Sequence, residues 1–151
     1  MKDIFKSIFY IFFPLFIGIV VSLFTSNFMD YSNLVKPPLS PPSILFPIVW
    51  TILYLLMGIS YFIIKKTNND DINLDFVYYI QLYVNALWSI IFFVLKWRFI
   101  SILWIILLDV LVIYMIYLFY KKVKLSAYLN IPYLIWILFA TYLTIGIYIL
   151  N

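Results

Sequence analysis

Side chains that could do chemistry recur at helical spacing within apolar stretches of this 151-residue chain. Gln81, Asn85 and Trp88 follow one another at i, i+4 and i+7, which places them on one face of a helix. Trp50 and Tyr54 stand one helical turn apart in another stretch. The chain has no cysteine and no histidine, which excludes disulfides, thiolate nucleophiles, imidazole bases and the usual zinc and haem-iron ligands. Any chemistry therefore depends on indole, phenol, amide and carboxyl groups.

The composition predicts an integral membrane protein. Hydrophobic residues make up 67% of the chain and charged residues 11%, against roughly 45–50% and 25% in soluble domains. Apolar runs of about 20 residues recur, each long enough to cross a hydrocarbon core of roughly 30 Å. The net charge of +4 comes from residues at the ends of these runs, so the expected partner is the lipid bilayer and not a nucleic acid.

The apolar runs predict one all-α domain, residues 1–151, folded as a bundle of five transmembrane helices. The connection from Thr25 to Ser40 is long and the others are short, which favours antiparallel neighbours. The first run, Ile4 to Phe24, exceeds the roughly 7–15 residue core of a signal peptide and lacks a small-x-small cleavage site, so a retained span is favoured over a cleaved signal. The predicted spans lie near residues 4–24, 41–65, 75–95, 99–120 and 126–150.

The positive charges predict that the amino terminus lies inside. With that orientation, seven of the ten basic residues face the cytoplasm, and Lys36, Lys96 and Arg98 lie outside. The lysines near the amino terminus also suit a bacterial cytoplasmic membrane.

Four spans bring a polar or indole group to a similar depth. At about 1.5 Å per residue, Trp50, Asn85, Asp109 and Trp136 each lie roughly 15 Å into their spans. The two tryptophans are therefore too deep to belong to an interfacial aromatic belt. Asp109 is costly there, by at least about 2.5 kcal/mol. Two interpretations remain open: a structural hydrogen bond from Asp109, neutral or paired with a Tyr, Asn or Gln, or a role in ligand binding or proton movement.

Three helix faces rich in aromatic rings could enclose a large, planar, mostly apolar molecule. Plain core packing would produce the same stripes, and the sequence alone leaves both interpretations open. The second-span face comprises Trp50, Leu53, Tyr54, Met57 and Tyr61; the third-span face comprises Tyr78, Gln81, Asn85 and Trp88; the fifth-span face comprises Tyr133, Trp136, Phe139, Ala140, Leu143 and Thr144.

Prolines surround the start of the second span. Ser40 is expected to cap this helix, with Pro41 and Pro42 in its first turn, where their missing N–H groups cost nothing. Pro47 is expected to kink the helix one turn before Trp50.

Several motifs together resemble the translocator protein family, the TspO/MBR group of tryptophan-rich sensory proteins and mitochondrial benzodiazepine receptors. Residues 46–54, FPIVWTILY, resemble its second-helix signature, and the third-helix side chains from Gln81 to Phe93 resemble the next motif. Asp109 resembles its fourth-helix acid, and residues 132–143 resemble the fifth-helix motif. The resemblance runs from about Tyr31 to the carboxyl terminus.

The resemblance implies a homodimer whose pocket lies beneath the first connection and binds porphyrins such as protoporphyrin IX, or benzodiazepine-site ligands. It implies a role in tetrapyrrole sensing or light-dependent porphyrin breakdown, in which Trp50 and Trp136 match two implicated indoles and would be catalytic. No metal site and no resident cofactor is implied, because porphyrin would be ligand or substrate; transport of porphyrin or another amphipathic molecule is the alternative function. The implied ligand-binding residues are Tyr31, Pro42, Phe46, Trp50, Tyr54, Gln81, Asn85, Trp88, Asp109, Trp136, Phe139, Ala140 and Leu143.

The chain departs from the family pattern at the first connection and at the carboxyl end. Leu39 and Asp30 stand where the family has tryptophans, so the lid over the pocket is expected to be less aromatic. Thr144 replaces an asparagine. No basic residue follows Tyr148, so the weak cholesterol motif is incomplete and sterol binding is not expected.

Overall fold

The computed structural model describes residues 1–68 and 70–151, and these residues are helical with irregular connections. Residue 69, in the predicted connection from Thr67 to Leu74, lies outside the described residues. The elements in chain order are α1 (Lys2–Thr25), the 3₁₀ turns η1 (Ser26–Phe28) and η2 (Tyr31–Asn33), α2 (Leu45–Lys66), α3 (Ile72–Ser89) with its π-helical continuation η3 (Ile90–Val94), α4 (Arg98–Lys122), α5 (Lys124–Leu129) and α6 (Ile131–Leu150).

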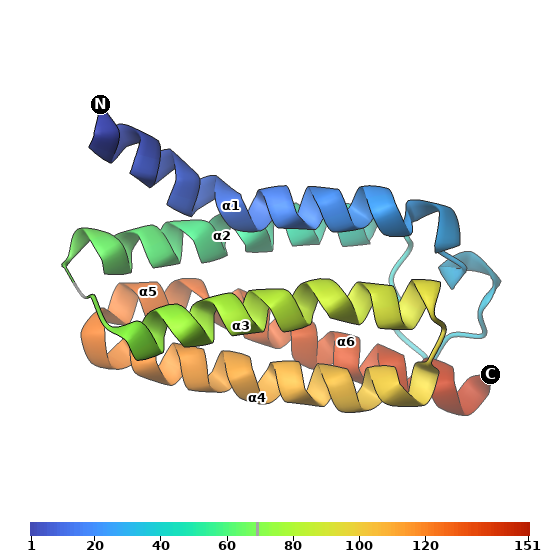
Figure 1. Cartoon of the computed structure of the whole chain (residues 1–151). Coiled ribbons are helices and arrows are strands. Elements are labelled where there is room, and N and C mark those ends of the chain that lie inside the picture. The colour runs from blue at the N-terminus through green and yellow to red at the C-terminus, as the bar shows by residue number, and fades with distance from the viewer. Residues whose placement is uncertain (69) are drawn as a thin grey trace.

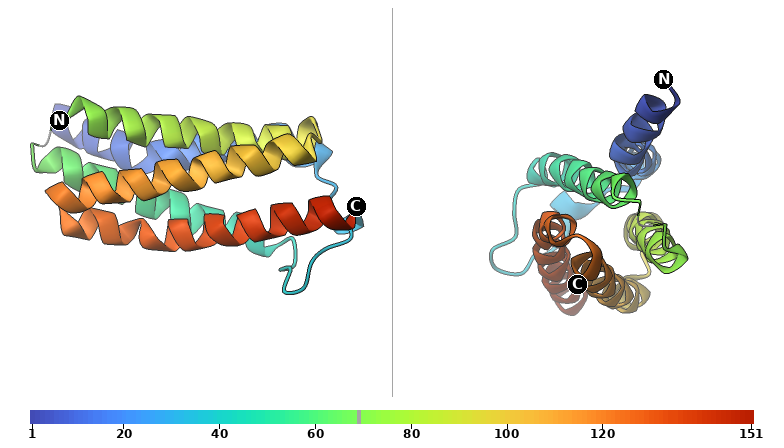
Figure 2. Two further views of the ribbon diagram at one scale, coloured as in Figure 1. Left: turned by 90° about the horizontal axis from the view of Figure 1, so that it is seen from below. Right: turned by 90° about the vertical axis from the view of Figure 1, so that its left-hand side faces the viewer.

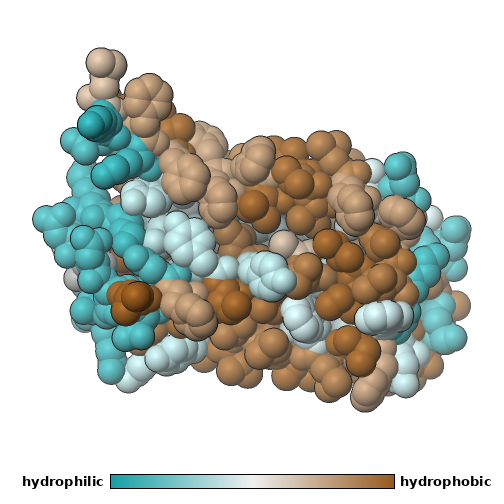
Figure 3. Space-filling model, viewed as in Figure 1, coloured by the Kyte–Doolittle hydropathy of each residue, from teal (hydrophilic) through white to brown (hydrophobic). Residues whose placement is uncertain are grey.

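The predicted five-helix membrane fold is confirmed. Within the described part of the chain, five helical segments of 22 to 27 residues are long and apolar enough to cross a membrane. They lie side by side along one axis (Figure 1). The face seen in Figure 3 is hydrophobic across its middle and hydrophilic at both ends, as a bilayer requires.

The helices surround a common core, and the contact between neighbouring long helices is weakest between α2 and α6. α1 packs on α2 and also touches α3, α3 packs on α4, and α4 packs on α6. α2 closes the circle mainly against the short α5 and makes little contact with α6 (Figure 2). The interior contains completely buried large side chains such as Met57, Tyr61, Tyr78 and Phe119.

α2 starts later than the prolines predict. Ser40 does not cap it, because its hydroxyl donates to the Pro37 carbonyl at 2.7 Å, and the helix begins at Leu45. Pro47 is therefore the third residue of α2, within the first turn, where no N–H has an intrahelical partner. The predicted kink at Pro47 is wrong for this reason: the ring replaces a donor that would be unpaired anyway.

The predicted fifth span contains a break. α5 ends at Leu129 and α6 begins at Ile131, with Pro132 in the first turn of α6. Asn130 at the break is fully buried, and its side-chain amide donates to Ser60 Oγ at 2.6 Å and to the Ser126 carbonyl at 2.9 Å. The amide replaces backbone hydrogen bonds lost at the break and ties it to α2.

The charged side chains separate to the two ends of the bundle. The seven lysines predicted to share a side lie at the end with the amino terminus, at the α2–α3 connection and where α4 meets α5 (Figure 1). At this end Lys65 pairs with Asp75 at 2.6 Å and with Asp70 at 3.3 Å. The orientation in a membrane stays a prediction from the positive-inside rule.

Close approach of α1 and α2 depends on a glycine. A Cβ added at Gly58 would collide with the backbone carbonyl of Ile11. Because the obstacle is backbone, a rotamer change cannot relieve it. Gly58 thus lets two helices pack at a distance that no larger residue permits.

We expect Gly58→Ala to lower the free energy of unfolding by about 1–3 kcal/mol, the usual cost of overpacking. In an unhindered helix the same change would be stabilising by roughly 0.5–1 kcal/mol, so the sign is diagnostic. Unfolding titrations in detergent micelles measure it, with Ile59→Ala on the exposed side of α2 as the control. A stabilised Gly58→Ala would contradict the described α1–α2 packing.

Candidate functional site

A buried hydrogen-bond network joins α2, α3 and α6 at the centre of the bundle. The Tyr54 hydroxyl donates to Asn85 Oδ1 at 3.1 Å, and Asn85 Nδ2 donates to the Tyr133 hydroxyl at 2.6 Å. Tyr133 in turn donates to Gln81 Oε1 at 2.9 Å, and Gln81 Nε2 lies 3.3 Å from the sulfur of Met57. The four polar groups are at most 8% exposed. Both amides of the predicted face therefore have protein partners, which gives them a structural role, and ligand binding by Gln81 and Asn85 stays a prediction.

Aromatic rings continue from this network toward the carboxyl-terminal end of α6. Trp50 stacks on Tyr54 with ring centroids 5.3 Å apart and meets the edge of Tyr133 at 6.2 Å. Phe46 contacts Trp136 at 5.9 Å, and Trp136 contacts Phe139 at 5.7 Å. The structure therefore brings the predicted residues of the second and fifth spans together.

The irregular segment 34–44, here called the strap, runs antiparallel to α6. Asn151 binds the Val35 backbone on both sides, accepting from its N–H at 3.0 Å and donating to its carbonyl at 2.8 Å. Pro37 fills the space beside Gly146, where an added Cβ would collide with its ring. The Tyr142 hydroxyl donates to the Pro38 carbonyl at 2.8 Å. The strap therefore descends beside α6, and α2 begins near the level of Trp136.

A groove of about 580 Å³ lies below the strap, between α2 and α6. Its wall combines the ring of Trp136 with Phe139 and with aliphatic side chains of α2. Trp136 Nε1 is buried and has no hydrogen-bond partner among the described residues. The groove is thus apolar, and the unpaired N–H of Trp136 is buried behind the ring that borders it. Its lining residues are Val49, Ile52, Leu53, Pro132, Ile135, Trp136 and Phe139.

Asp109 forms an interhelical hydrogen bond with a partner that the sequence did not predict. The Thr141 hydroxyl lies 2.8 Å from Asp109 Oδ2 and 2.9 Å from the Ile137 carbonyl of its own helix. Thr141 is the donor in both contacts, so its hydroxyl joins α6 to α4 while it also bonds to its own helix. The expected partners Tyr, Asn or Gln are wrong, and Oδ1 has no hydrogen-bond partner within residues 1–68 and 70–151.

The predicted single layer is spread along the bundle. Asn85 lies at the level of Tyr133, whereas Asp109 lies at the level of Thr141. These positions on α6 are eight residues apart, or about 12 Å. The depths were counted from predicted span starts, and α3 begins at Ile72, three residues before the predicted start, which accounts for about 4.5 Å of this spread.

The other predicted site residues lie around this region in different roles. Trp88 stacks on Phe92 at 5.0 Å, and its Nε1 is buried with no partner in the described part of the chain. Ala140 and Leu143 are buried in α6. Pro42 is exposed, and its carbonyl accepts from the Leu45 N–H at 3.0 Å.

Comparison with known proteins identifies the family. The sequence model described as TspO/MBR family matches residues 10–150. The tryptophan-rich protein TspO of Archaeoglobus fulgidus is 40% identical over 138 residues, which cover 89% of this chain and 90% of that protein. The namesake in Chlorobaculum tepidum is 36% identical over 124 residues, covering 80% and 78%, and protein CrtK of Rhodobacter capsulatus is 35% identical over the same length and shares. The chain belongs to the TspO/MBR family. It is an integral membrane protein.

Two departures from the TspO/MBR pattern have clear structural outcomes. Leu39 has a positive φ of 66° and is 86% exposed, so its side chain points away from the bundle. Asp30 accepts two bonds from Arg98 Nη2, at 3.0 and 2.8 Å, while Arg98 Nη1 donates to the Phe92 carbonyl at 2.8 Å. An ion pair therefore fastens the segment 26–33, here called the lid, at a position where the resemblance implies an indole.

Tyr31 and Lys36 fold the segment between Asp30 and the strap. Lys36 Nζ donates to the carbonyls of Tyr31 at 3.0 Å and Leu34 at 3.2 Å, and lies 4.9 Å from the centre of the Tyr31 ring. The Tyr31 hydroxyl donates to the Pro41 carbonyl at 2.9 Å, and its ring meets Phe46 at 5.0 Å. Burial raises the pKa of Tyr31, which keeps the hydroxyl protonated as a donor.

Sequence reasoning missed the roles of Tyr133, Thr141, Arg98 and Asn151. Tyr133 was placed on the correct helix face but not among the site residues. The sequence analysis treats Arg98 only as a membrane anchor. Asp30, an acidic residue in the long connection, could have indicated an ion pair. The pairing of Asn151 with Val35 joins residues 116 positions apart, and no local pattern indicates it.

We expect Arg98→Gln to loosen the lid, because the truncation leaves the Phe92 carbonyl without its donor and Asp30 with only the exposed Lys96, 3.6 Å away, at a cost of about 1–3 kcal/mol. Amide hydrogen exchange in residues 29–36 should accelerate by about tenfold or more, since each 1.4 kcal/mol is a factor of ten.

Lys96→Gln is the matched control. Lys96 is more exposed and lies 3.6 Å from the same carboxylate, so its loss should change exchange little. Equal exchange in the two variants would show that the Arg98 pair does not hold the lid.

Proposed function

We propose that this TspO/MBR protein binds a tetrapyrrole of the protoporphyrin IX type at the groove between α2 and α6, and acts in tetrapyrrole sensing or light-dependent catabolism. The observation that carries the proposal is the wall of the groove, where Trp136 offers aromatic surface and where its N–H, buried behind that surface, lacks a protein acceptor and becomes reachable when a ligand parts α2 and α6. A buried unpaired donor costs about 1–3 kcal/mol, which a ligand acceptor would recover.

The chemistry of the site suits a planar, mostly apolar ligand with few polar atoms. Phe46, Trp136 and Phe139 form a contiguous aromatic surface beside the aliphatic side chains of α2. Metal-free porphyrin suits it better than haem with ordinary axial ligation, because the sequence has neither histidine nor cysteine. The name of a relative in Cereibacter sphaeroides, tryptophan-rich sensory protein, supports the sensory part of the proposal; that protein is 32% identical over 111 residues.

Entry from the bilayer is part of the proposal. The strap is tied to α6, whereas α2 and α6 have little mutual contact below it. An apolar ligand dissolved in the membrane can therefore reach Trp136 between these helices. A homodimer, benzodiazepine-site ligands and an inside amino terminus are proposed from the family resemblance and from the lysine distribution.

We expect Trp136→Phe to weaken protoporphyrin IX binding about five- to tenfold, because the ring is kept but a hydrogen bond worth about 1–1.5 kcal/mol is lost. Absorbance titration in the dark measures the affinity, with Trp97→Phe at the exposed α3–α4 turn as the control. No saturable shift in the wild type, or the same affinity in both variants, would count against this site.

The same titration under illumination tests the catabolic part. Indole participation predicts that wild type bleaches bound porphyrin faster than Trp136→Phe or Trp50→Phe at equal occupancy. Equal bleaching would leave a binding protein without Trp-assisted chemistry.

Transport is a second candidate because Asp109 presents a buried, unpaired carboxyl oxygen. A carrier that uses this group should lose porphyrin counterflow in proteoliposomes when Asp109 is changed to Asn, whereas dark binding should persist. Absence of counterflow in the wild type would eliminate the carrier.

A further inference from the structure

One face of α2 carries a continuous line of oxidisable side chains that the binding site does not use in full. Trp50, Tyr54, Met57 and Tyr61 stand at i, i+4, i+7 and i+11, all on one side of the helix. Trp50 stacks on Tyr54, and Met57 and Tyr61 are at most 1% exposed. The line extends about 16 Å toward the lysine-rich end of the bundle. It begins at Trp50, which lies next to the groove-lining Val49 but does not itself line the groove.

The far end of this line differs chemically from the near end. The hydroxyl of Tyr61 donates to the Asp75 carboxylate at 2.7 Å. The hydroxyls of Tyr54 and Tyr133 donate instead to amide oxygens of Asn85 and Gln81. A phenol that loses an electron becomes a strong acid, and a carboxylate can take its proton whereas an amide cannot.

The surroundings of Tyr61 would stabilise the oxidised ring. Tyr61 stacks on Tyr78 with ring centroids 3.9 Å apart and an interplanar angle of 2°, so spin density can be shared. Asp75 also contacts Lys65 at 2.6 Å, and Lys65 retains Asp70 as a partner when Asp75 becomes neutral. Of the described tyrosines, Tyr61 therefore has the surroundings that best stabilise a tyrosyl radical.

We propose that α2 conducts a one-electron oxidation from Trp50 to Tyr61, with Asp75 as the proton acceptor. The oxidant is the photoexcited tetrapyrrole of the proposed function, on which the physiological role of this relay rests. The tetrapyrrole gains one electron from Trp50, and Trp50 regains one from Tyr61 by way of Tyr54 and Met57. The O–H bond of Tyr61 breaks and its proton goes to Asp75, leaving a neutral phenoxyl radical and a carboxylic acid.

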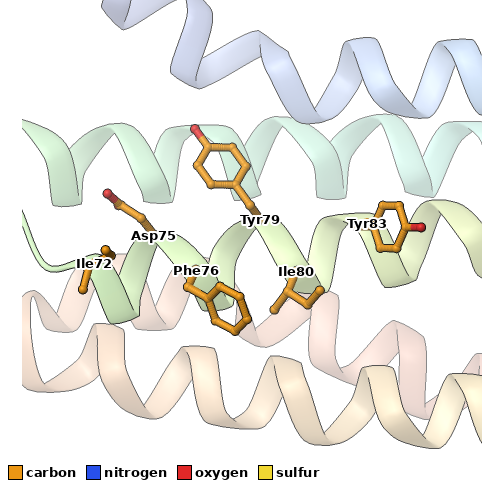
Figure 4. A pocket seen from close by; sticks show the side chains of 6 residues that line it. All are labelled: Ile72, Asp75, Phe76, Tyr79, Ile80 and Tyr83. Carbon is orange, nitrogen blue, oxygen red and sulfur yellow. The ribbon is translucent and has the colours of Figure 1, made fainter.

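The relay separates charge across the bundle. It places the vacancy about 16 Å from Trp50, which slows return of the electron and leaves the reduced tetrapyrrole time to react. A hollow of about 430 Å³ on the outer side of α3 exposes the neighbourhood of Asp75 and Tyr79 (Figure 4). Tyr61 itself is buried, so a soluble one-electron donor of the ascorbate class restores it through Tyr79, whose ring centroid lies 5.6 Å from that of Tyr61, with Asp75 returning the proton.

The test uses an oxidant that needs no porphyrin. Because the chain has no cysteine, Ile52→Cys gives a single attachment point in the groove for a ruthenium polypyridyl photosensitiser. Flash excitation with a sacrificial electron acceptor, followed by freezing, traps radicals for electron paramagnetic resonance. We expect a neutral tyrosyl radical whose yield falls at least about tenfold in Tyr61→Phe and is unchanged in Tyr83→Phe, an exposed tyrosine of α3.

A second variant keeps the ring in place. Asp75→Asn removes the proton acceptor, so the tyrosyl yield should fall although Tyr61 and its stacking remain, and circular dichroism confirms folding of each variant. Equal yields in Tyr61→Phe and Tyr83→Phe, or a radical that remains on tryptophan in the wild type, would overturn the relay. An unchanged yield in Asp75→Asn would overturn the role of the carboxylate. Failure of the separate porphyrin titration would instead count against the proposed function.

Discussion

The hydrogen bonds of Asn85 are the constraint on which the arrangement of the other helices depends. In a hydrocarbon environment an unpaired amide costs several kcal/mol, so the helices around it must approach until its groups are paired. Asn85 is bonded to Tyr54 of α2 and Tyr133 of α6, and these bonds fix both helices relative to α3. Gln81, one turn away, completes the pairing. The bundle is therefore tight at this level.

Toward the carboxyl-terminal end of α6, α2 and α6 separate, and the proposed site lies in the space between them. α2 begins only at Leu45, and the space beside the carboxyl-terminal half of α6 is taken by the strap. An irregular segment exposes backbone polar groups, and here Asn151 and Tyr142 bind the Val35 and Pro38 groups. Between the strap and the Asn85 network, Trp136 and the first turns of α2 border the groove.

Sequence reasoning predicted the number of spans, their approximate limits, the faces of the aromatic stripes and the family. These follow from hydropathy and helical periodicity, which are local properties, and from contiguous motifs. It failed where a residue's role depended on where a helix actually starts. Pro47 illustrates this: the same residue would kink a helix that began at Pro41, but it is harmless in one that begins at Leu45. The partner of Asp109 was also missed, because Thr141 is 32 residues away and nothing local distinguishes it from another buried hydroxyl.

Asp30, at the position where the resemblance implies an indole, bears on how the proposed ligand would enter. An indole at this position would move aside at the cost of van der Waals contacts alone. Opening the lid in this protein instead breaks the two hydrogen bonds between Arg98 and Asp30. It also exposes Phe92, whose ring centre lies 4.1 Å from the guanidinium carbon of Arg98. Asn151 and Tyr142 hold the strap from α6 independently of that pair. The connection between α1 and α2 is thus fastened at two separate places, the lid on α4 and the strap on α6. Since α2 and α6 have little mutual contact below the strap, separating them disrupts fewer interactions, and the side that faces the lipid is the easier route for an apolar ligand.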